Sequence, residues 1–244
     1  MTAVINDHLV LICGPSAAGK SASLHTLANP EGVLYACCEA GKRLPFRSKF
    51  KEINVTDPVR HIPELFQYAE QTEKVHTVVI DTLTFLMDMY ESLYVLPAKD
   101  KMAGWSNYAE FFRNMMQQRV APSKKNMIFL AHTLTNYDQN TLNMTTSVPI
   151  KGALKNIGIE SMFSCVVAAK KMSLESLAPY ANPLLKITPM DEMLGYKHVF
   201  QTQITKDTIG ERIRGTMGMW TLEETFIDND AQLLLNRLHE FHDA

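Results

Sequence analysis

Eight consecutive residues near the start of the sequence have the spacing of a phosphate-binding loop. They are Gly14, Pro15, Ser16, Ala17, Ala18, Gly19, Lys20 and Ser21, which read G-x-x-x-x-G-K-S. Glycines let the backbone curl so that successive N–H groups face a phosphate, and the start of a following helix adds unpaired donors. In such a loop the lysine bridges the β- and γ-phosphates and the serine hydroxyl ligates Mg²⁺. We therefore expect these residues to bind a nucleoside triphosphate.

Asp81 is the candidate for a second residue on the metal side of this loop. It follows the apolar run Val78-Val79-Ile80, which is typical of a buried strand. Ligands of open α/β sheets bind at the carboxyl ends of the strands, and an aspartate at that edge helps to hold Mg²⁺ in phosphate-loop proteins. Ser21 and Asp81 are thus the predicted metal residues, with Asp81 acting through a water molecule.

Two further polar residues follow strand-like runs. Glu39 comes after residues 33–38, and His132 comes after residues 127–131. A carboxylate at this edge can orient an attacking water if it is ionised and within hydrogen-bonding reach. A histidine beside it could sense the γ-phosphate and pass its state to the segment that follows. The residues alone are as consistent with a solvated loop glutamate and a satisfied polar histidine.

Three cations lie close together late in the sequence. Lys206, Arg212 and Arg214 fall within residues 205–215. Cations here could reach the γ-phosphate of a neighbouring subunit and stabilise the charge of the transition state. A solvated hairpin would explain the same residues, so both interpretations stay open on local grounds.

Several loops combine cations with aromatic residues, as sites for single-stranded nucleic acid do. The candidates are Lys99, Lys101 and Trp105 in one segment, and Tyr137, Lys151 and Lys155 in or after another. A basic run over residues 42–51 could contribute as well. Solvated charged surfaces are the alternative explanation for each of these groups.

His239 and His242, together with Glu240, could be mistaken for a metal site near the C-terminal end. The sequence has no H-E-x-x-H motif there and shows no third ligand. We therefore interpret these residues as the polar side of a terminal helix.

The composition is that of a globular protein. The chain has 244 residues, of which 46% are hydrophobic and 20% charged, a size and balance that suit one α/β domain over residues 1–244. No apolar stretch approaches the roughly 20 residues that cross a bilayer, and no signal peptide is visible.

The four cysteines show no C-x-x-C pairing, so free buried thiols in a reducing cytosol are expected. With a net charge of −2, any nucleic-acid binding must use a local basic face.

Strand-like and helical segments alternate through the first two thirds of the sequence. The expected strands are 9–13, 33–38, 53–55, 75–81 and 127–132, and the expected helices follow the phosphate loop to residue 28, then cover 58–73, 83–94 and a segment that Ser106 caps. Asp57-Pro58 is typical of a helix start. Tyr108, Phe111, Phe112, Met115 and Met116 share one helical face and are expected in the core. Residues 96–105 and 133–149 are expected to be loops.

The last third of the sequence has a different pattern. The segments 163–169, 184–188, 199–205 and 217–222 suggest strands without long helices between them, and a helix closes the chain over about 228–242. Continuous apolar strands alternating with helices favour a parallel sheet covered on both faces. We therefore expect an α/β fold with a mainly parallel central sheet and an antiparallel C-terminal extension.

The ordered set of motifs resembles a known family. The set comprises the phosphate loop, Cys38-Glu39-Ala40-Gly41, Val78-Val79-Ile80-Asp81-Thr82, Phe129-Leu130-Ala131-His132-Thr133 and Ile204-Thr205-Lys206-Asp207. It resembles the compact RecA-like P-loop ATPases of many bacteriophages, which look like a RecA/Rad-type core without flanking domains and are associated with single-strand annealing and recombination. The resemblance covers roughly residues 8–220.

The resemblance implies roles for individual positions. Glu39 matches the glutamate that activates water, and His132 stands where a polar residue links the γ-phosphate to the second DNA-binding loop, although RecA itself has glutamine there. Residues 97–105 and 134–157 would be the two DNA-facing loops. Lys206 matches a basic residue that acts across the subunit interface. Thr208 departs from the family pattern, which commonly has arginine, and Arg212 or Arg214 could substitute.

The resemblance therefore implies a Mg²⁺-dependent ATPase that binds single-stranded DNA and promotes annealing or recombination. ATP would lie between head-to-tail copies of the chain, in a ring or a filament, and a single-strand-binding protein is a further candidate partner. No membrane partner is expected, and the location would be the cytoplasm, that of the host if a phage encodes the protein. The alternatives are a small-molecule or nucleotide kinase and a nucleotide-gated assembly protein of replication or packaging without turnover.

Overall fold

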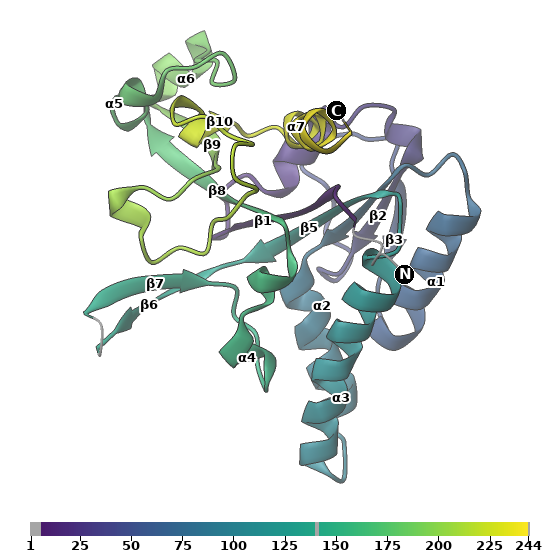
Figure 1. Ribbon diagram of the computed structural model, residues 1–244. Helices are drawn as coiled ribbons and strands as arrows, with labels where there is room; N and C mark the ends of the chain where they lie inside the picture. The colour runs from purple at the N-terminus through teal and green to yellow at the C-terminus, as the bar shows by residue number, and fades with distance from the viewer. Residues whose placement is uncertain (1–5, 140–141, 244) are drawn as a thin grey trace.

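The structure is a computed structural model that describes residues 6–139 and 142–243. Within these residues, eight strands form a central sheet in the order β10-β9-β8-β1-β5-β4-β2-β3 (Figure 1). The strands are β1 (Leu9–Gly14), β2 (Val33–Cys37), β3 (Lys51–Asn54), β4 (Thr77–Asp81), β5 (Asn126–His132), β8 (Cys165–Ser173), β9 (Tyr196–Gln201) and β10 (Phe226–Asp228). Pairing is parallel from β3 through β8 and antiparallel from β8 to β9 and β10. The predicted fold class is confirmed.

Helices cover both faces of this sheet (Figure 1). On one face, α1 (Pro58–Gln71), α2 (Leu83–Tyr90) and α3 (Lys101–Asn114) pack into one hydrophobic core. On the other face, α7 (Ala231–His242) and the 3₁₀ turn Ser21–Thr26 close a second core against β1 and its neighbours. The segment after the phosphate loop is thus a 3₁₀ turn, where the sequence suggested a longer helix.

Shorter elements connect these layers. They are the π-helical turns Glu91–Val95 and Met115–Val120, the helices α4 (Leu154–Ile157), α5 (Leu174–Leu177) and α6 (Pro189–Leu194), and the 3₁₀ turns Pro30–Gly32, Ile159–Met162, Ala178–Tyr180, Lys206–Thr208 and Glu223–Thr225. In the part of the chain that is described, no helix combines the length and the apolar character needed to cross a membrane.

Two helix starts show how local residues fix the elements. Asp57 accepts hydrogen bonds from the backbone N–H groups of Val59 and Arg60, and Pro58 opens α1, as predicted. The start predicted for the next long helix is wrong. Asp100, and not Ser106, caps α3, so residues 101–105 are helical and not part of a loop. An aspartate in the second half of a supposed loop was the signal for this cap.

The prediction of an aperiodic loop over residues 133–149 is also wrong. Residues Leu134–Asp138 and Asn143–Ser147 form the antiparallel hairpin β6–β7. The hydroxyls of Thr135 and Thr146, on facing strands, lie 2.9 Å apart. Polar threonines have a high strand propensity, and their polarity concealed the strands. Residues 140 and 141 lie outside the described part.

In the last third, two expected strands are absent from the described residues. Residues 184–188 and 217–222 have no strand conformation. The first expected strand begins at Cys165 and pairs in parallel with β1, so the antiparallel extension consists of β9 and β10 alone. That residues 1–244 form one domain stays a prediction.

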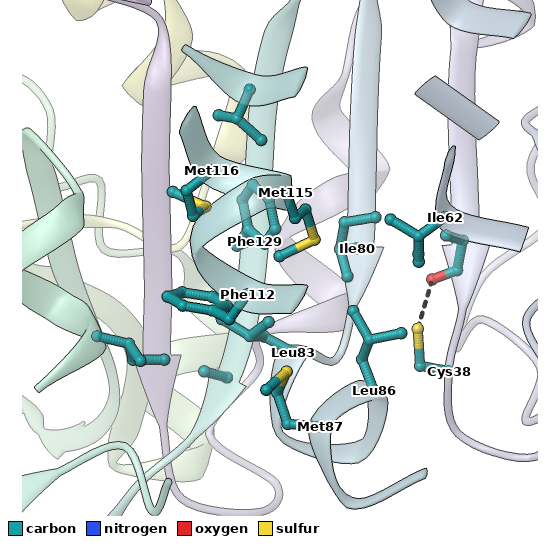
Figure 2. Packing of buried hydrophobic residues seen from close by; sticks show 14 of the residues in the cluster. Cys38, Ile62, Ile80, Leu83, Leu86, Met87, Phe112, Met115, Met116 and Phe129 are labelled. Carbon is teal, nitrogen blue, oxygen red and sulfur yellow. Dashed lines mark hydrogen bonds between the residues drawn. The ribbon is translucent and has the colours of Figure 1, made fainter. Parts of the chain in front are cut away.

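The core beneath α3 has the composition that the sequence predicted. Tyr108, Phe112, Met115 and Met116 are buried and Phe111 packs against them. Figure 2 shows Phe112 beside Leu83, with Met115, Met116 and Phe129 in the same layer. The apolar stripe at i, i+3, i+4, i+7 and i+8 therefore holds α3 and the turn after it on the sheet.

Phe112→Ala should lower the free energy of unfolding by about 3–5 kcal/mol, because a fully buried ring is replaced by a cavity. Urea denaturation followed by circular dichroism measures this loss. Phe241→Ala is the matched control, since Phe241 is 37% exposed, and it should change the midpoint little. Equal losses in the two variants would contradict the assignment of Phe112 to the core.

Candidate functional site

The phosphate loop leaves the carboxyl end of β1 at the centre of the sheet. Gly14 ends the strand, and a Cβ atom there would lie 2.5 Å from the carbonyl oxygen of Ala169. Gly19 has a φ of +96°, and a Cβ atom there would lie 2.8 Å from Nδ2 of Asn229. Glycine is therefore required at position 14 by the close approach of a backbone carbonyl group and at position 19 by the left-handed conformation.

Two residues from distant parts of the chain hold this loop from outside. Nδ2 of Asn229 donates to the carbonyl oxygen of Gly19 at 3.0 Å, and Nδ1 of His198 donates to that of Ala18 at 3.1 Å. Sequence reasoning missed both residues, because nothing in their local sequence connects them with residues 14–21. They support the curled backbone whose N–H groups would face the phosphates.

Lys20 is buried within the loop that it belongs to. Its Nζ donates to the carbonyl oxygens of Gly14 and Pro15, both at 2.8 Å, and lies 3.4 Å from Nδ1 of His132. Burial lowers the pKa of Lys20 to about 8, although Asp81 and Glu39 oppose this shift. A phosphate group would replace neutral carbonyls by anionic oxygens around this ammonium.

The side chains of Ser21 and Asp81 are in contact, as the predicted Mg²⁺ site requires. The Ser21 hydroxyl donates to Oδ2 of Asp81 at 2.8 Å, and the hydroxyl of Tyr35 donates to the same oxygen at 2.7 Å. The other carboxylate oxygen, Oδ1, is buried and has no hydrogen-bond partner among the described residues. An unsatisfied buried carboxylate oxygen calls for a partner, and oxygen donors of this kind suit Mg²⁺. Ser21 and Asp81 therefore fit a Mg²⁺ ion.

Tyr35 is a third residue that the sequence analysis missed. It lies on β2, and its ring is buried beside Phe50. By binding Oδ2, its hydroxyl fixes which carboxylate oxygen of Asp81 stays available. Burial raises the pKa of Asp81, whereas the hydrogen bonds from Tyr35 and Ser21 act in the opposite direction.

Glu39 and His132 lie next to each other at the same edge. Nε2 of His132 is 3.3 Å from Oε1 of Glu39, while Nζ of Lys42 donates to Oε2 at 2.6 Å. Lys20 can only donate, so Nδ1 of His132 accepts and Nε2–H donates to Glu39. Burial alone would raise the pKa of Glu39, but the hydrogen bonds and charges of Lys42 and His132 lower it overall. Glu39 is therefore ionised at neutral pH.

These side chains border one cavity of about 360 Å³. Its lining includes Ser16, Ala17, Ala18, Gly19, Lys20, Ser21, Glu39, Lys42, His132, His198 and Asn229. A larger cavity of about 800 Å³ lies on the other side of the loop, between β8 and the β6–β7 hairpin. The larger one lacks Lys20, Ser21 and Glu39 in its described lining, so we assign the phosphate chemistry to the smaller one.

His132 is joined to the β6–β7 hairpin through a single residue. Thr133 alone separates the end of β5 from the start of β6. The N–H of Thr133 donates to the carbonyl oxygen of Gly14 at 3.2 Å, and this oxygen also accepts from Lys20. The carbonyl oxygen of Gly14 thus accepts one hydrogen bond from the phosphate loop and one from the residue that leads into the hairpin.

The three late cations do not line the 360 Å³ cavity. Arg212 forms an ion pair with the buried Glu160 at 3.0 Å, and Nη1 of Arg214 donates to the carbonyl oxygen of Ser161 at 3.5 Å. Lys206 is exposed in its 3₁₀ turn, and among the described residues its ammonium has no ion-pair partner. Arg212 instead borders the larger cavity, which residues 14–18 of the phosphate loop also line.

The candidate DNA-binding residues have different environments. Lys101 donates to the carbonyl oxygens of Val95 and Leu96, and Trp105 packs edge-on against Tyr108. Lys151 pairs with Glu91. Lys99, Tyr137 and Lys155 are exposed, as Lys101 and Lys151 are, and they lie on the turn before α3, on β6 and on α4 respectively.

If the Lys20 ammonium binds the phosphates, the affinity for a nucleoside triphosphate should fall above about pH 8. In the free protein Lys20 loses its proton near that pH, and phosphate binding must restore it, so the Kd should rise by up to about tenfold per pH unit. Titration with a fluorescent nucleotide between pH 6.5 and 9.5 at fixed Mg²⁺ measures this. Lys20→Arg should lose the slope, since arginine does not titrate in this range. A pH-independent wild-type Kd would contradict the assignment.

Comparisons with known proteins agree with this geometry at the level of the family. A family model described as an AAA domain matches residues 7–209, which is most of the chain. No curated protein matches the sequence. Among the solved structures that match is a crystal structure of the RadB recombinase, at 14% sequence identity and a TM-score of 0.41, covering 84% of this chain and 90% of that one. The chain belongs to the AAA domain family, and its phosphate loop, buried aspartate and parallel sheet are those of a P-loop NTPase.

Proposed function

We propose that the protein is a Mg²⁺-dependent ATPase of RecA-like type that acts in the cytoplasm on single-stranded DNA, promoting annealing and homologous recombination, as in the phage single-strand annealing family. The observation that carries this proposal is the contact between Glu39 and His132 beside Lys20. It provides an ionised carboxylate next to the phosphate cavity and a polar residue joined to an exposed hairpin.

The hydrolytic step would use residues of the cavity in separate roles. The backbone N–H groups of residues 14–21 and the Lys20 ammonium would hold the phosphates, and the bound Mg²⁺ would neutralise developing charge on the β- and γ-phosphate oxygens. Ser21 and Asp81 would hold the metal. Glu39 would accept a hydrogen bond from the attacking water and orient it in line with the γ-phosphate.

DNA binding would use the exposed hairpin and the segments beside it. Tyr137 lies on β6, 56% exposed, and Lys155 lies on α4. Aromatic rings stack on bases of any sequence and lysines contact the phosphates, which is the usual way to hold single strands. His132 would transmit the occupancy of the γ-phosphate position to this hairpin through Thr133.

ATP would lie at the contact between two head-to-tail copies of the chain. The support is that Lys206 is exposed and that none of the three cations lines the 360 Å³ cavity of its own chain. A cation from the neighbouring copy would then stabilise the transition state. Such a heterologous contact makes rings if it closes and filaments if it does not.

Glu39→Gln should lower ATP hydrolysis by roughly 100-fold or more while ATP binding stays nearly unchanged, because the amide cannot act as a base. Steady-state phosphate release with and without single-stranded DNA, together with nucleotide titration, measures both. Glu31→Gln is the matched control, since Glu31 also pairs with lysines but precedes β2.

The same assays distinguish the alternatives. An assembly protein without turnover would respond little to Glu39→Gln. A kinase would phosphorylate a nucleoside or a sugar, and DNA would change neither its turnover nor its oligomer size.

Tyr137→Ala should weaken the binding of single-stranded DNA by roughly tenfold, because one stacked base contributes about 1–3 kcal/mol. Fluorescence anisotropy with a labelled oligonucleotide and an ATP analogue is the measurement. Tyr68→Ala on α1 removes a ring from another face and should leave the affinity as it is. Equal effects of the two variants would exclude the hairpin as the DNA-binding element.

A further inference from the structure

A cluster of two histidines and one aspartate lies at the opposite end of β1 from the phosphate loop. His8 directly precedes β1, whereas His239 and Asp243 lie one helical turn apart at the end of α7. Gly14, which begins the phosphate loop, ends the same strand. The cluster is therefore separate from the nucleotide site.

The three side chains converge on one point. Nε2 of His8 is 3.3 Å from Oδ1 of Asp243, and Nδ1 of His239 is 2.7 Å from Oδ2 of the same carboxylate. The two imidazole rings lie side by side with centroids 3.9 Å apart. One candidate ligand atom from each residue lies within 4.8 Å of the other two. Ligands of one Zn²⁺ ion, each about 2.0–2.2 Å from it, must lie within about 4 Å of one another, so the three side chains would have to close in slightly around the ion.

The surroundings orient the two histidines as metal ligands. Nε2 of His239 donates to Oδ1 of Asn126 at 3.0 Å, and Nδ1, which lies 2.7 Å from Oδ2 of Asp243, faces the cluster, where a bound metal ion would displace its proton. Metal-binding histidines characteristically donate their second N–H to such a partner. The backbone of His8 is fixed at both sides, because its N–H donates to Asn6 and its carbonyl accepts from Met127.

His8 itself has an unsatisfied atom in the cluster. Its Nε2 is buried and makes no well-aligned hydrogen bond to any described residue, despite its proximity to Asp243. A neutral imidazole with an available lone pair is the form that binds metals.

We propose that His8, His239 and Asp243 form a binding site for one Zn²⁺ ion. Two imidazoles and one carboxylate suit zinc, whereas Mg²⁺ prefers oxygen ligands alone. The fourth position would be taken by water. The bound ion would tie the end of α7 to the starts of β1 and β5, so its role is to stabilise the second hydrophobic core. The sequence analysis took His239 for a polar helix residue because its partner His8 comes from the far end of the described chain.

The test uses the full chain after treatment with a chelator, titrated with Zn²⁺ against a chromogenic zinc indicator in excess Mg²⁺-nucleotide. The wild type should bind one equivalent, and His8→Ala and Asp243→Asn should each weaken binding by roughly tenfold or more. Asn126→Leu should weaken it by about tenfold, because Nε2 of His239 loses the acceptor that orients its ring. His242→Ala, next to Asp243 but outside the cluster, is the control and should bind as the wild type does. Nucleotide binding reports that each variant is folded.

Two further readouts do not depend on the indicator. Co²⁺ in place of Zn²⁺ should give visible absorption that is lost in both ligand variants. Saturating Zn²⁺ should raise the Tm of the wild type by on the order of 5 °C and that of the variants by less, since a ligand that binds only the folded state stabilises it. Absence of saturable binding, or equal binding in wild type and both ligand variants, would overturn the proposal. If Asp243→Asn lowers the Tm without zinc and the wild type binds none, the cluster is an ion pair only.

Discussion

The site depends on the register of four parallel strands. Gly14 of β1 lies opposite His132 of β5, and Asp81 of β4 lies opposite Leu130 of β5 and Cys37 of β2. Parallel pairing brings the carboxyl ends of strands to one edge, so the residues that follow each strand become neighbours. A slip of one residue in any of these pairs would turn its side chains to the other face and separate the phosphate loop from its partners.

Most of this edge was accessible from the sequence, because each functional residue stands in or directly after a short apolar run that is buried on both faces. The phosphate loop, Asp81, Glu39 and His132 were found in this way, and the structure brings them together. Tyr35, His198 and Asn229 could not be found, since their contacts with the site come from tertiary packing. The hairpin and the start of α3 were missed for local reasons: threonines concealed the strands, and Asp100 was not taken as a cap.

The cations of the candidate site bind groups of the protein itself. Lys20 donates to two loop carbonyls, and Glu39 is held between Lys42 and His132. Buried charges require such partners, because an unpaired one is strongly unfavourable. The proposed nucleotide binding would consequently exchange internal contacts for contacts with phosphate, and the net affinity would be the difference between the two sets.

The carbonyl group of Gly14 accepts hydrogen bonds from both Lys20 and Thr133. If Lys20 turns toward an incoming anion, this acceptor keeps a single donor, and the bond from Thr133 strengthens because the two donors no longer compete. The hairpin would then be anchored more rigidly at its base whenever the neighbouring pocket is filled. A change in the ligand of one lysine would in this way become a change in the mechanical stiffness of a surface element, without any movement of the sheet.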